Sequence, residues 1–186
     1  MGSPGHQIRC APSAGRTAGP TAAAAAAAVG PSEEAVAADR WRYARHLDRL
    51  AAAVVAGAAG EAAVVAEVLR DRDPVMAQSA VVTHLDRRAV RLRPGAAFQD
   101  WARALHRVLD GHAFPDRRLR EWTLLKAVEA GAGWSRAELA AASDWCQRTA
   151  AQSPAPDEAL ALLAASGRTR RVRNTAARRL DRRATS

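Results

Sequence analysis

The chain has 186 residues, enough for one domain of ordinary size with a tail. Its 28 basic and 19 acidic residues give a net charge of +9, and its two cysteines exclude both a disulfide framework and a zinc site of the C-x2-C kind. No uninterrupted apolar run approaches the roughly 18 residues of a membrane span. We expect no membrane partner, because the arginine-rich C-terminal segment lacks bulky apolar residues to insert into a membrane surface.

The cationic charge is nearly all guanidinium, because Lys126 is the only lysine. Arginine binds phosphate and carboxylate groups through two parallel hydrogen bonds, so this bias favours an acidic partner. A codon bias toward arginine and alanine would produce the same composition. Cys10 and Cys146 lie far apart and favour free thiols, which indicates a reducing, cytoplasmic location.

Residues 1–32 contain no acid and hold seven consecutive alanines, from Ala22 to Ala28. A low-complexity segment with almost no large apolar group cannot offset its ordering entropy, so we expect a disordered tail over 1–32 and a helical-repeat domain over 33–186. A secretory signal is an alternative, with Arg9 and Arg16 preceding the alanines, but this alanine run lacks leucine. A transit peptide or a start codon assigned too early are further alternatives.

Helical periodicity begins at Ser32, which can cap a helix that starts at Glu33 and is ended by Gly57 and Gly60. A short helix over 61–71 follows. Asp73 and Pro74 have the residue types of an N-cap and a first helical position, and they predict a helix over about 74–90.

Five more helices are expected after the break at 93–95. They cover about 97–112, 114–130, 135–152 and 156–166, with the arginine-rich helix last. The sequence SRAE at Ser135–Glu138 is a capping box that opens the third of these. No alternating β-branched run predicts a strand, so the expected fold is all-α with about eight helices.

Prolines near 74, 115 and 156 recur in steps of about 41 residues, within the range of HEAT and armadillo repeats. The stretch VRNTAARRL, at 172–180, resembles the second-helix pattern of HEAT repeats, and DPVMAQSAVVTHL, at 73–85, resembles it more loosely. The second stretch departs at Met76 and at Leu85, which falls two positions late, and residues 97–130 match in spacing alone. The resemblance implies a short right-handed HEAT-like α-solenoid. An irregular helical bundle is the alternative.

The sequence offers no catalytic motif, metal cluster or cofactor-binding loop, so we expect no catalytic residue, metal or cofactor. The histidines are scattered, and Cys146 falls on the apolar side of its helix, as a buried thiol would.

An acid precedes tryptophan three times, at Asp100-Trp101, Glu121-Trp122 and Asp144-Trp145. These pairs are similar to the acids and aromatic residues of HEAT-like DNA glycosylases. Such a resemblance implies a nucleic-acid enzyme as the alternative function, although no specific motif of that family is matched. Tryptophans that fill an alanine-rich core would explain the pairs equally well.

The closing segment 168–186 carries eight arginines and one aspartate, a net charge of +7, whereas the other residues carry 20 basic and 18 acidic groups, or +2. On a helical wheel, Val172, Ala176 and Leu180 form a narrow inward stripe with Thr169. A polar cap of a repeat array would account for such a helix, but a cap does not require one sign of charge. The predicted anion-binding residues are Arg168, Arg170, Arg171, Arg173, Arg178, Arg179, Arg182 and Arg183.

We therefore expect a non-enzymatic helical-repeat module that binds a macromolecule. The partner is an acidic protein or, through the arginine helix, a nucleic-acid backbone.

Overall fold

The computed structural model describes residues 32–185, and every regular element within that range is a helix. The predicted all-α class is therefore confirmed for this part of the chain, while the predicted tail over 1–32 lies almost wholly outside the described residues. The elements are α1 (Glu33–Ala53), the 3-10 turn η1 (Val54–Ala56), α2 (Gly57–Val68), α3 (Pro74–Arg91), α4 (Ala96–Leu109), α5 (Ala113–Ala130), α6 (Arg136–Ala141), α7 (Asp144–Gln152), α8 (Asp157–Ser166) and α9 (Arg170–Ala184).

The helix starts follow local chemistry at most of the predicted positions. Asp73 accepts hydrogen bonds from the backbone N–H groups of Val75 and Met76 at 3.1 and 3.0 Å, with Pro74 as the first helical residue. The Ser135 hydroxyl likewise accepts from the backbone N–H of Glu138 at 3.1 Å. Asp73 and Ser135 are thus confirmed as N-cap residues.

One expected helix, over 135–152, is divided into α6 and α7. Ser143 has an extended backbone and its hydroxyl accepts a hydrogen bond from the N–H of Cys146 at 3.2 Å, so it caps a new helix. Gln147 stabilises the break, because its buried amide donates to the carbonyl oxygens of Leu139 and Ala140 at 3.0 and 2.8 Å. The described residues therefore hold nine α-helices where about eight were expected.

The start of the second helix also differs from the prediction. α2 begins at Gly57, whose φ of 73° allows the sharp turn after η1, and Gly60 lies inside the helix. A Cβ atom at Gly60 would stand 2.5 Å from the Cβ of Ala56, so this glycine permits a close approach and does not end a helix.

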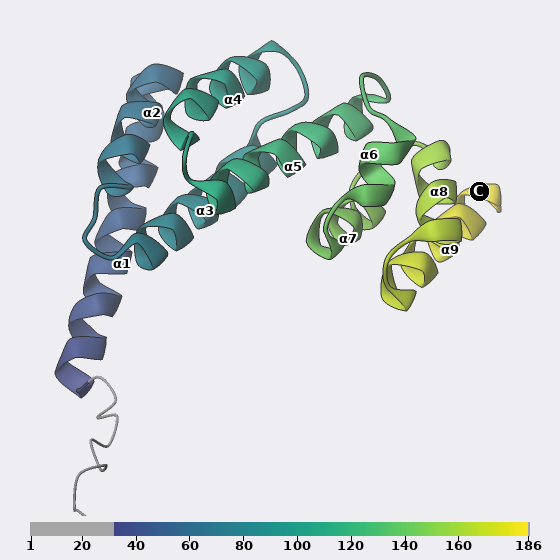
Figure 1. The fold of residues 1–186 in the computed structure, drawn as a ribbon. Helices are drawn as coiled ribbons and strands as arrows, with labels where there is room; N and C mark the ends of the chain where they lie inside the picture. Colours follow the sequence, from purple (N-terminus) through teal and green to yellow (C-terminus); the bar gives the residue numbers. More distant parts are fainter. Residues whose placement is uncertain (1–31, 186) are drawn as a thin grey trace, which may run out of the picture.

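The helices pack in two series. The odd-numbered helices α1, α3, α5, α7 and α9 each contact the next odd-numbered helix, while α2 contacts α4 and α6 contacts α8. Figure 1 shows the result as an arch, in which α3 and α5 form the span and α1 and the α6–α9 group descend at its two ends. One cluster of buried residues runs through it from Leu50 to Ala176.

The proline spacing does not follow this pairing to the end of the chain. Pro156 precedes α8, which packs on α6, whereas Pro74 and Pro115 begin helices of the odd-numbered series. The division of 135–152 into α6 and α7 adds one helix to the order. For that reason the proline spacing of about 41 residues no longer marks the odd-numbered helices after α5.

Candidate functional site

The arginine-rich helix α9 packs through a narrow apolar stripe, as its sequence predicts. Val172 and Ala176 are buried, and Leu180 is partly buried against the same core. Thr169 caps the helix, and its hydroxyl accepts a hydrogen bond from the N–H of Val172 at 3.3 Å and donates to Asp144 at 3.1 Å. The backbone N–H of Arg168 donates to the buried side chain of Gln147 at 2.8 Å. Residues of α7 therefore fix the point where α9 begins.

Three of the eight predicted anion-binding arginines, Arg173, Arg179 and Arg183, are bonded to groups outside α9. Their guanidinium groups donate to backbone carbonyl oxygens around the ends of α7 and α8, which have no partner inside those helices. The pairs are Arg173 with Gly167 at 2.7 Å, Arg179 with Ala151 at 3.0 Å and Ser153 at 2.5 Å, and Arg183 with Ala155 at 2.9 Å and with the Asp157 carboxylate. These three side chains hold α9 against the rest of the domain.

The charges around Arg179 repel one another. Burial lowers the pKa of Arg179 below its usual value, and the neighbouring charges of Arg183 and Arg182 lower it further. Positive charge is therefore crowded at this end of the domain, and an anion would relieve that crowding.

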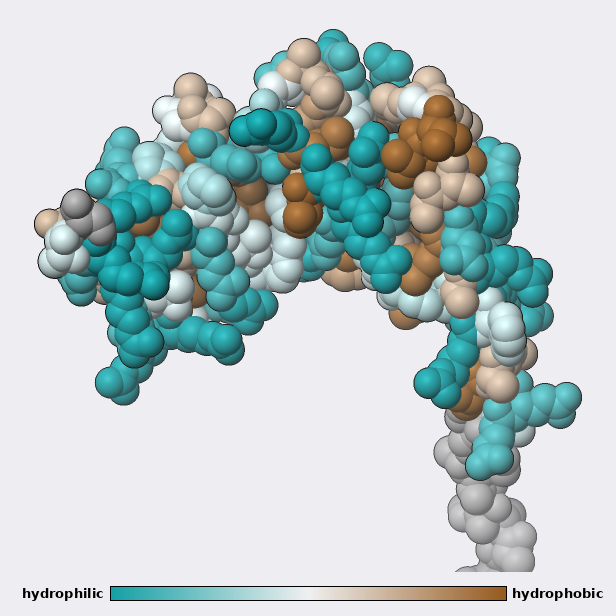
Figure 2. Space-filling view, turned by 180° about the vertical axis from the view of Figure 1, so that it is seen from behind, coloured by the Kyte–Doolittle hydropathy of each residue, from teal (hydrophilic) through white to brown (hydrophobic). Residues whose placement is uncertain are grey.

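The other five arginines of the predicted set are exposed to solvent: Arg168, Arg170, Arg171, Arg178 and Arg182. Among the described residues, the side chains of the first four form no ion pair or hydrogen bond, and the one acid of α9, Asp181, forms no ion pair with any of them. Figure 2, which shows the molecule from behind, has long hydrophilic side chains extending from the α8–α9 end of the arch.

Two of these arginines stand where a helix disfavours positive charge. Arg170 and Arg171 lie in the first turn of α9, which contains no acid. The N-terminal end of a helix carries a partial positive charge, and a cation there is unfavourable by about 0.3–1 kcal/mol. Folding of α9 alone gives no reason for this arrangement, so we treat the exposed arginines as the candidate site.

The tryptophans that follow acids in the sequence do not form a second site. Trp101 and Trp122 are buried between helices, and their indole N–H groups donate to Glu61 at 2.6 Å and to Asp86 at 2.7 Å. Each indole thus bonds an acid that lies 40 or 36 residues earlier in the chain, and neither bonds the acid beside it. Asp100, next to Trp101, is exposed and pairs with Arg103.

Glu61 is the most deeply buried acid of the described chain, with no exposed surface. His84 donates to the same oxygen as Trp101, at 2.7 Å, and Arg88 donates to the other oxygen at 3.3 Å. Burial raises the pKa of Glu61, but the hydrogen bonds from His84 and Trp101 and the charges of His84 and Arg88 lower it by more. The carboxylate is therefore ionised and joins α2, α3 and α4.

A similar contact joins α3, α5 and α7. Arg118 donates to Asp86 at 2.7 Å, and its guanidinium lies 3.5 Å from the centre of the Trp145 ring. Trp145 in turn meets Trp122 edge to face, with ring centres 5.5 Å apart. Arg118, Asp86, Trp122 and Trp145 thus contact one another, which indicates a role in packing.

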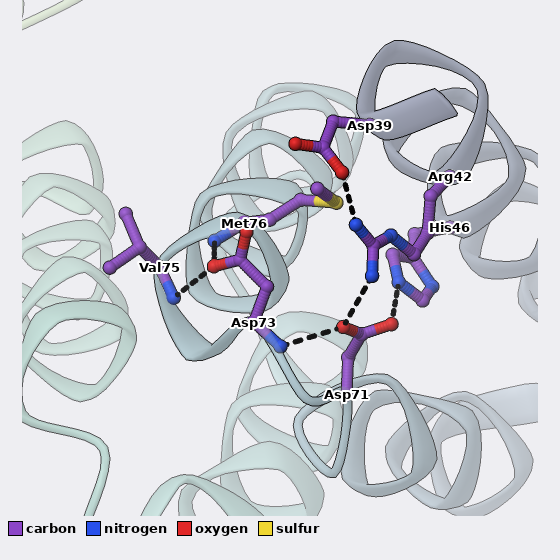
Figure 3. A network of polar contacts seen from close by, with 7 residues as sticks. All are labelled: Asp39, Arg42, His46, Asp71, Asp73, Val75 and Met76. Carbon is purple, nitrogen blue, oxygen red and sulfur yellow. Dashed lines mark hydrogen bonds and ion pairs between the residues drawn. The ribbon is translucent and has the colours of Figure 1, made fainter. Parts of the chain in front are cut away.

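Helix α1 has a polar contact with the α2–α3 turn, drawn in Figure 3. Asp71, which follows α2, accepts from His46 of α1 at 2.9 Å and from the backbone N–H of Asp73 at 2.9 Å, and Arg42 of α1 lies 3.8 Å away. The bond from the Asp73 N–H lowers the pKa of Asp71, burial raises it, and His46 and Arg42 lower it again, with a net decrease. The network ties the α2–α3 turn back to α1.

Nucleophilic and metal chemistry has no candidate in the described part of the chain. Cys146 is fully buried, and burial with the nearby charge of Glu121 raises its pKa to about 12, while Arg118 opposes the shift. The expectation of a buried thiol is thus confirmed for Cys146, whereas Cys10 lies outside the described residues. Residues 32–185 hold no group of three metal-ligating side chains.

One stretch, 36–68, is long and apolar enough to cross a membrane by length and composition alone, although charged residues interrupt it. In the structure it comprises most of α1, η1 and α2, with α2 folded back along α1. Arg49 bonds Glu67, 18 positions later in the chain, which one straight helix could not allow.

Comparisons of the chain with protein-family models, with curated proteins and with solved structures returned no match.

Proposed function

We propose that the chain is a non-enzymatic helical-repeat module, built as a short right-handed HEAT-like α-solenoid, that binds an acidic macromolecule through α9. Each repeat in such an array contacts its neighbouring repeats. The contacts between successive helices of the series α1, α3, α5, α7 and α9 support the proposed solenoid. The indole bonds from Trp101 to Glu61 and from Trp122 to Asp86 support it too, because each joins successive helices of one series, α2 to α4 and α3 to α5.

The observation that carries the binding proposal is the unpaired positive charge of α9. Arg168, Arg170, Arg171 and Arg178 are exposed and form no ion pair with any described residue. The partner is an acidic protein or a nucleic-acid backbone, and a cytoplasmic location, consistent with the free thiol of Cys146, belongs to the same proposal.

The alternative of an enzyme that resembles HEAT-like DNA glycosylases has no comparable support. Such an enzyme needs an acid and aromatic residues on one open face. Trp101 and Trp122 are 2% and 6% exposed, and their indole N–H groups are already bonded.

The test is equilibrium binding of the full chain to two soluble polyanions, duplex DNA and polyglutamate, at about 50 mM salt. The proposal predicts micromolar or tighter binding to at least one of them, release by added salt, and recovery of the ligand chemically unchanged. Failure to bind either polyanion at low salt would contradict it, and so would chemical conversion of a bound ligand.

A further inference from the structure

The exposed arginines of α9 are arranged as a line. Arg171 and Arg178 are seven residues apart, so their side chains point in directions that differ by about 20° around the helix axis. Arg182 is four residues further on, and its direction differs from that of Arg178 by about 40°. At about 1.5 Å per residue the three positions span about 16 Å along the helix, with Arg170 beside the first. A row of guanidinium groups on one face suits a partner with regularly repeated negative charge.

The rest of that face contains no apolar anchor. Asn174, Asp181 and Thr185 are the other exposed residues on it. Protein interfaces take most of their affinity from a few buried residues, in which arginine is usually combined with aromatic anchors such as tryptophan and tyrosine. Interfaces with nucleic acid are polar and strongly positive, and most of their hydrogen bonds reach phosphate and sugar oxygens.

Among the described residues of 131–185, no aromatic ring is fully exposed, since Trp134 and Trp145 are both partly buried. The described tryptophan with the largest exposed fraction, 74%, is Trp41 of α1, at the opposite end of the arch (Figure 1). Binding of single strands relies on bases that stack on exposed aromatic rings. A double-stranded backbone needs only the cationic row.

We propose that the outer face of α9, formed by Arg170, Arg171, Arg178 and Arg182, binds the phosphodiester backbone of a double-stranded nucleic acid without reading its sequence. This inference rests on the proposed function and narrows its partner to one class. Arg173, Arg179 and Arg183, whose guanidinium groups bond carbonyl oxygens outside α9, hold the helix in place and lie outside the contact.

The experiment is fluorescence anisotropy with the full chain and two unrelated DNA duplexes of about 20 base pairs, between about 50 and 200 mM salt. Four phosphate contacts predict a slope of about −3.6 for log affinity against log salt, or a loss of about 150-fold over that range. The two duplexes bind within about threefold of each other, and polyglutamate competes at least about tenfold less well.

Paired variants locate the contact. Arg171→Gln with Arg178→Gln reduces the slope to about −1.8, because two phosphate contacts are lost. Arg103→Gln with Arg120→Gln removes the same net charge from side chains that are 71% and 65% exposed and already paired with Asp100 and Asp116, and it leaves the slope near its original value. Circular dichroism confirms that both variants are folded.

Three results would overturn the inference. Polyglutamate that competes as well as DNA makes the partner an acidic protein and leaves the proposed function standing. A duplex affinity that the Arg171 and Arg178 substitutions do not change moves the contact to another face. Absence of binding to either polyanion removes both this inference and the proposed function.

Discussion

Replacing Glu61 by glutamine tests whether the buried carboxylate holds the first helices together. The amide keeps the shape of the side chain but removes its charge, while His84, Trp101 and Arg88 still direct their donors at it. The hydrogen bonds from His84 and Trp101 then end on a neutral oxygen instead of a charged carboxylate. The new amide NH2 group faces the N–H of Arg88, so two donors oppose each other. Bonds to charged groups contribute about 1.5–3 kcal/mol each, and loss of one partner of a buried ion pair costs about 3–5 kcal/mol. We expect a loss of about 2–4 kcal/mol.

The assay is urea unfolding followed by circular dichroism at neutral pH. Glu67→Gln is the matched control on the same helix, because the Glu67 side chain is 52% exposed and pairs with Arg49 at the surface. Its expected effect is below about 1 kcal/mol. Equal midpoints for the two variants would refute the view that Glu61 joins α2, α3 and α4.

The pH dependence of the same variant follows from the lowered pKa of Glu61. A carboxyl group whose pKa is lower in the folded state contributes stability that is present above its unfolded pKa of about 4.5 and is lost as the pH falls through the folded value. The stability difference between the wild-type chain and Glu61→Gln is therefore full at neutral pH and shrinks below about pH 4.5. A difference that grew under acid would contradict this sign.

Three further outcomes follow from single contacts. Arg179→Gln leaves carbonyl oxygens at the end of α7 without their donor and lowers the free energy of unfolding by about 1–3 kcal/mol. Arg178→Gln changes the free energy of unfolding by less than about 0.5 kcal/mol. Equal losses in urea unfolding would contradict the division of the arginines into those bonded outside α9 and those left exposed. Cys146, with a pKa raised to about 12, reacts with a thiol reagent at pH 8 only as fast as the domain opens, and rapid labelling at Cys146 itself in the folded chain would contradict its burial. Gly60→Ala places a methyl group 2.5 Å from the Cβ of Ala56 and lowers the free energy of unfolding by about 1–3 kcal/mol. An unchanged melting temperature would contradict this and show that the α1–α2 turn relaxes freely.

Local chemistry made several helix boundaries predictable from the sequence. Asp73 with Pro74 and Ser135 with Glu138 act within four residues, so their caps can be recognised from residue types and spacing. The same kind of signal was present at Ser143, a serine followed by an aspartate, but the apolar periodicity across 135–152 favoured one continuous helix. The amide of Gln147, which stabilises the break, bonds carbonyl groups seven and eight residues away and leaves no trace in the local pattern.

The acid–tryptophan pairs show where reasoning from sequence neighbours fails. Adjacent residues on a helix point about 100° apart, so an acid next to a buried tryptophan points elsewhere, as Asp100 does. The actual partner, Glu61, had a weak signal: it shares one face with Val65 and Val68, at the spacing of a core stripe. A lone acid on such a stripe predicts a buried carboxylate with donors, but the sequence does not name those donors.

The arginine helix was predictable in part. A helical wheel placed Val172 and Ala176 inward, as observed, because that needs only the periodicity of the helix. It could not tell that Arg173, Arg179 and Arg183 reach carbonyl groups around the ends of neighbouring helices, because those contacts depend on how α7, α8 and α9 pack. The site proposed here is accordingly smaller than the set of eight arginines, and it consists of those that packing leaves outward.

Hydrogen exchange of the full chain with and without a DNA duplex, at low salt and saturating ligand, tests the central claim most directly. The account predicts that the duplex slows amide exchange in α9, with the remaining helices unchanged. Slower exchange confined to another helix, or no change anywhere at saturating duplex, would contradict it.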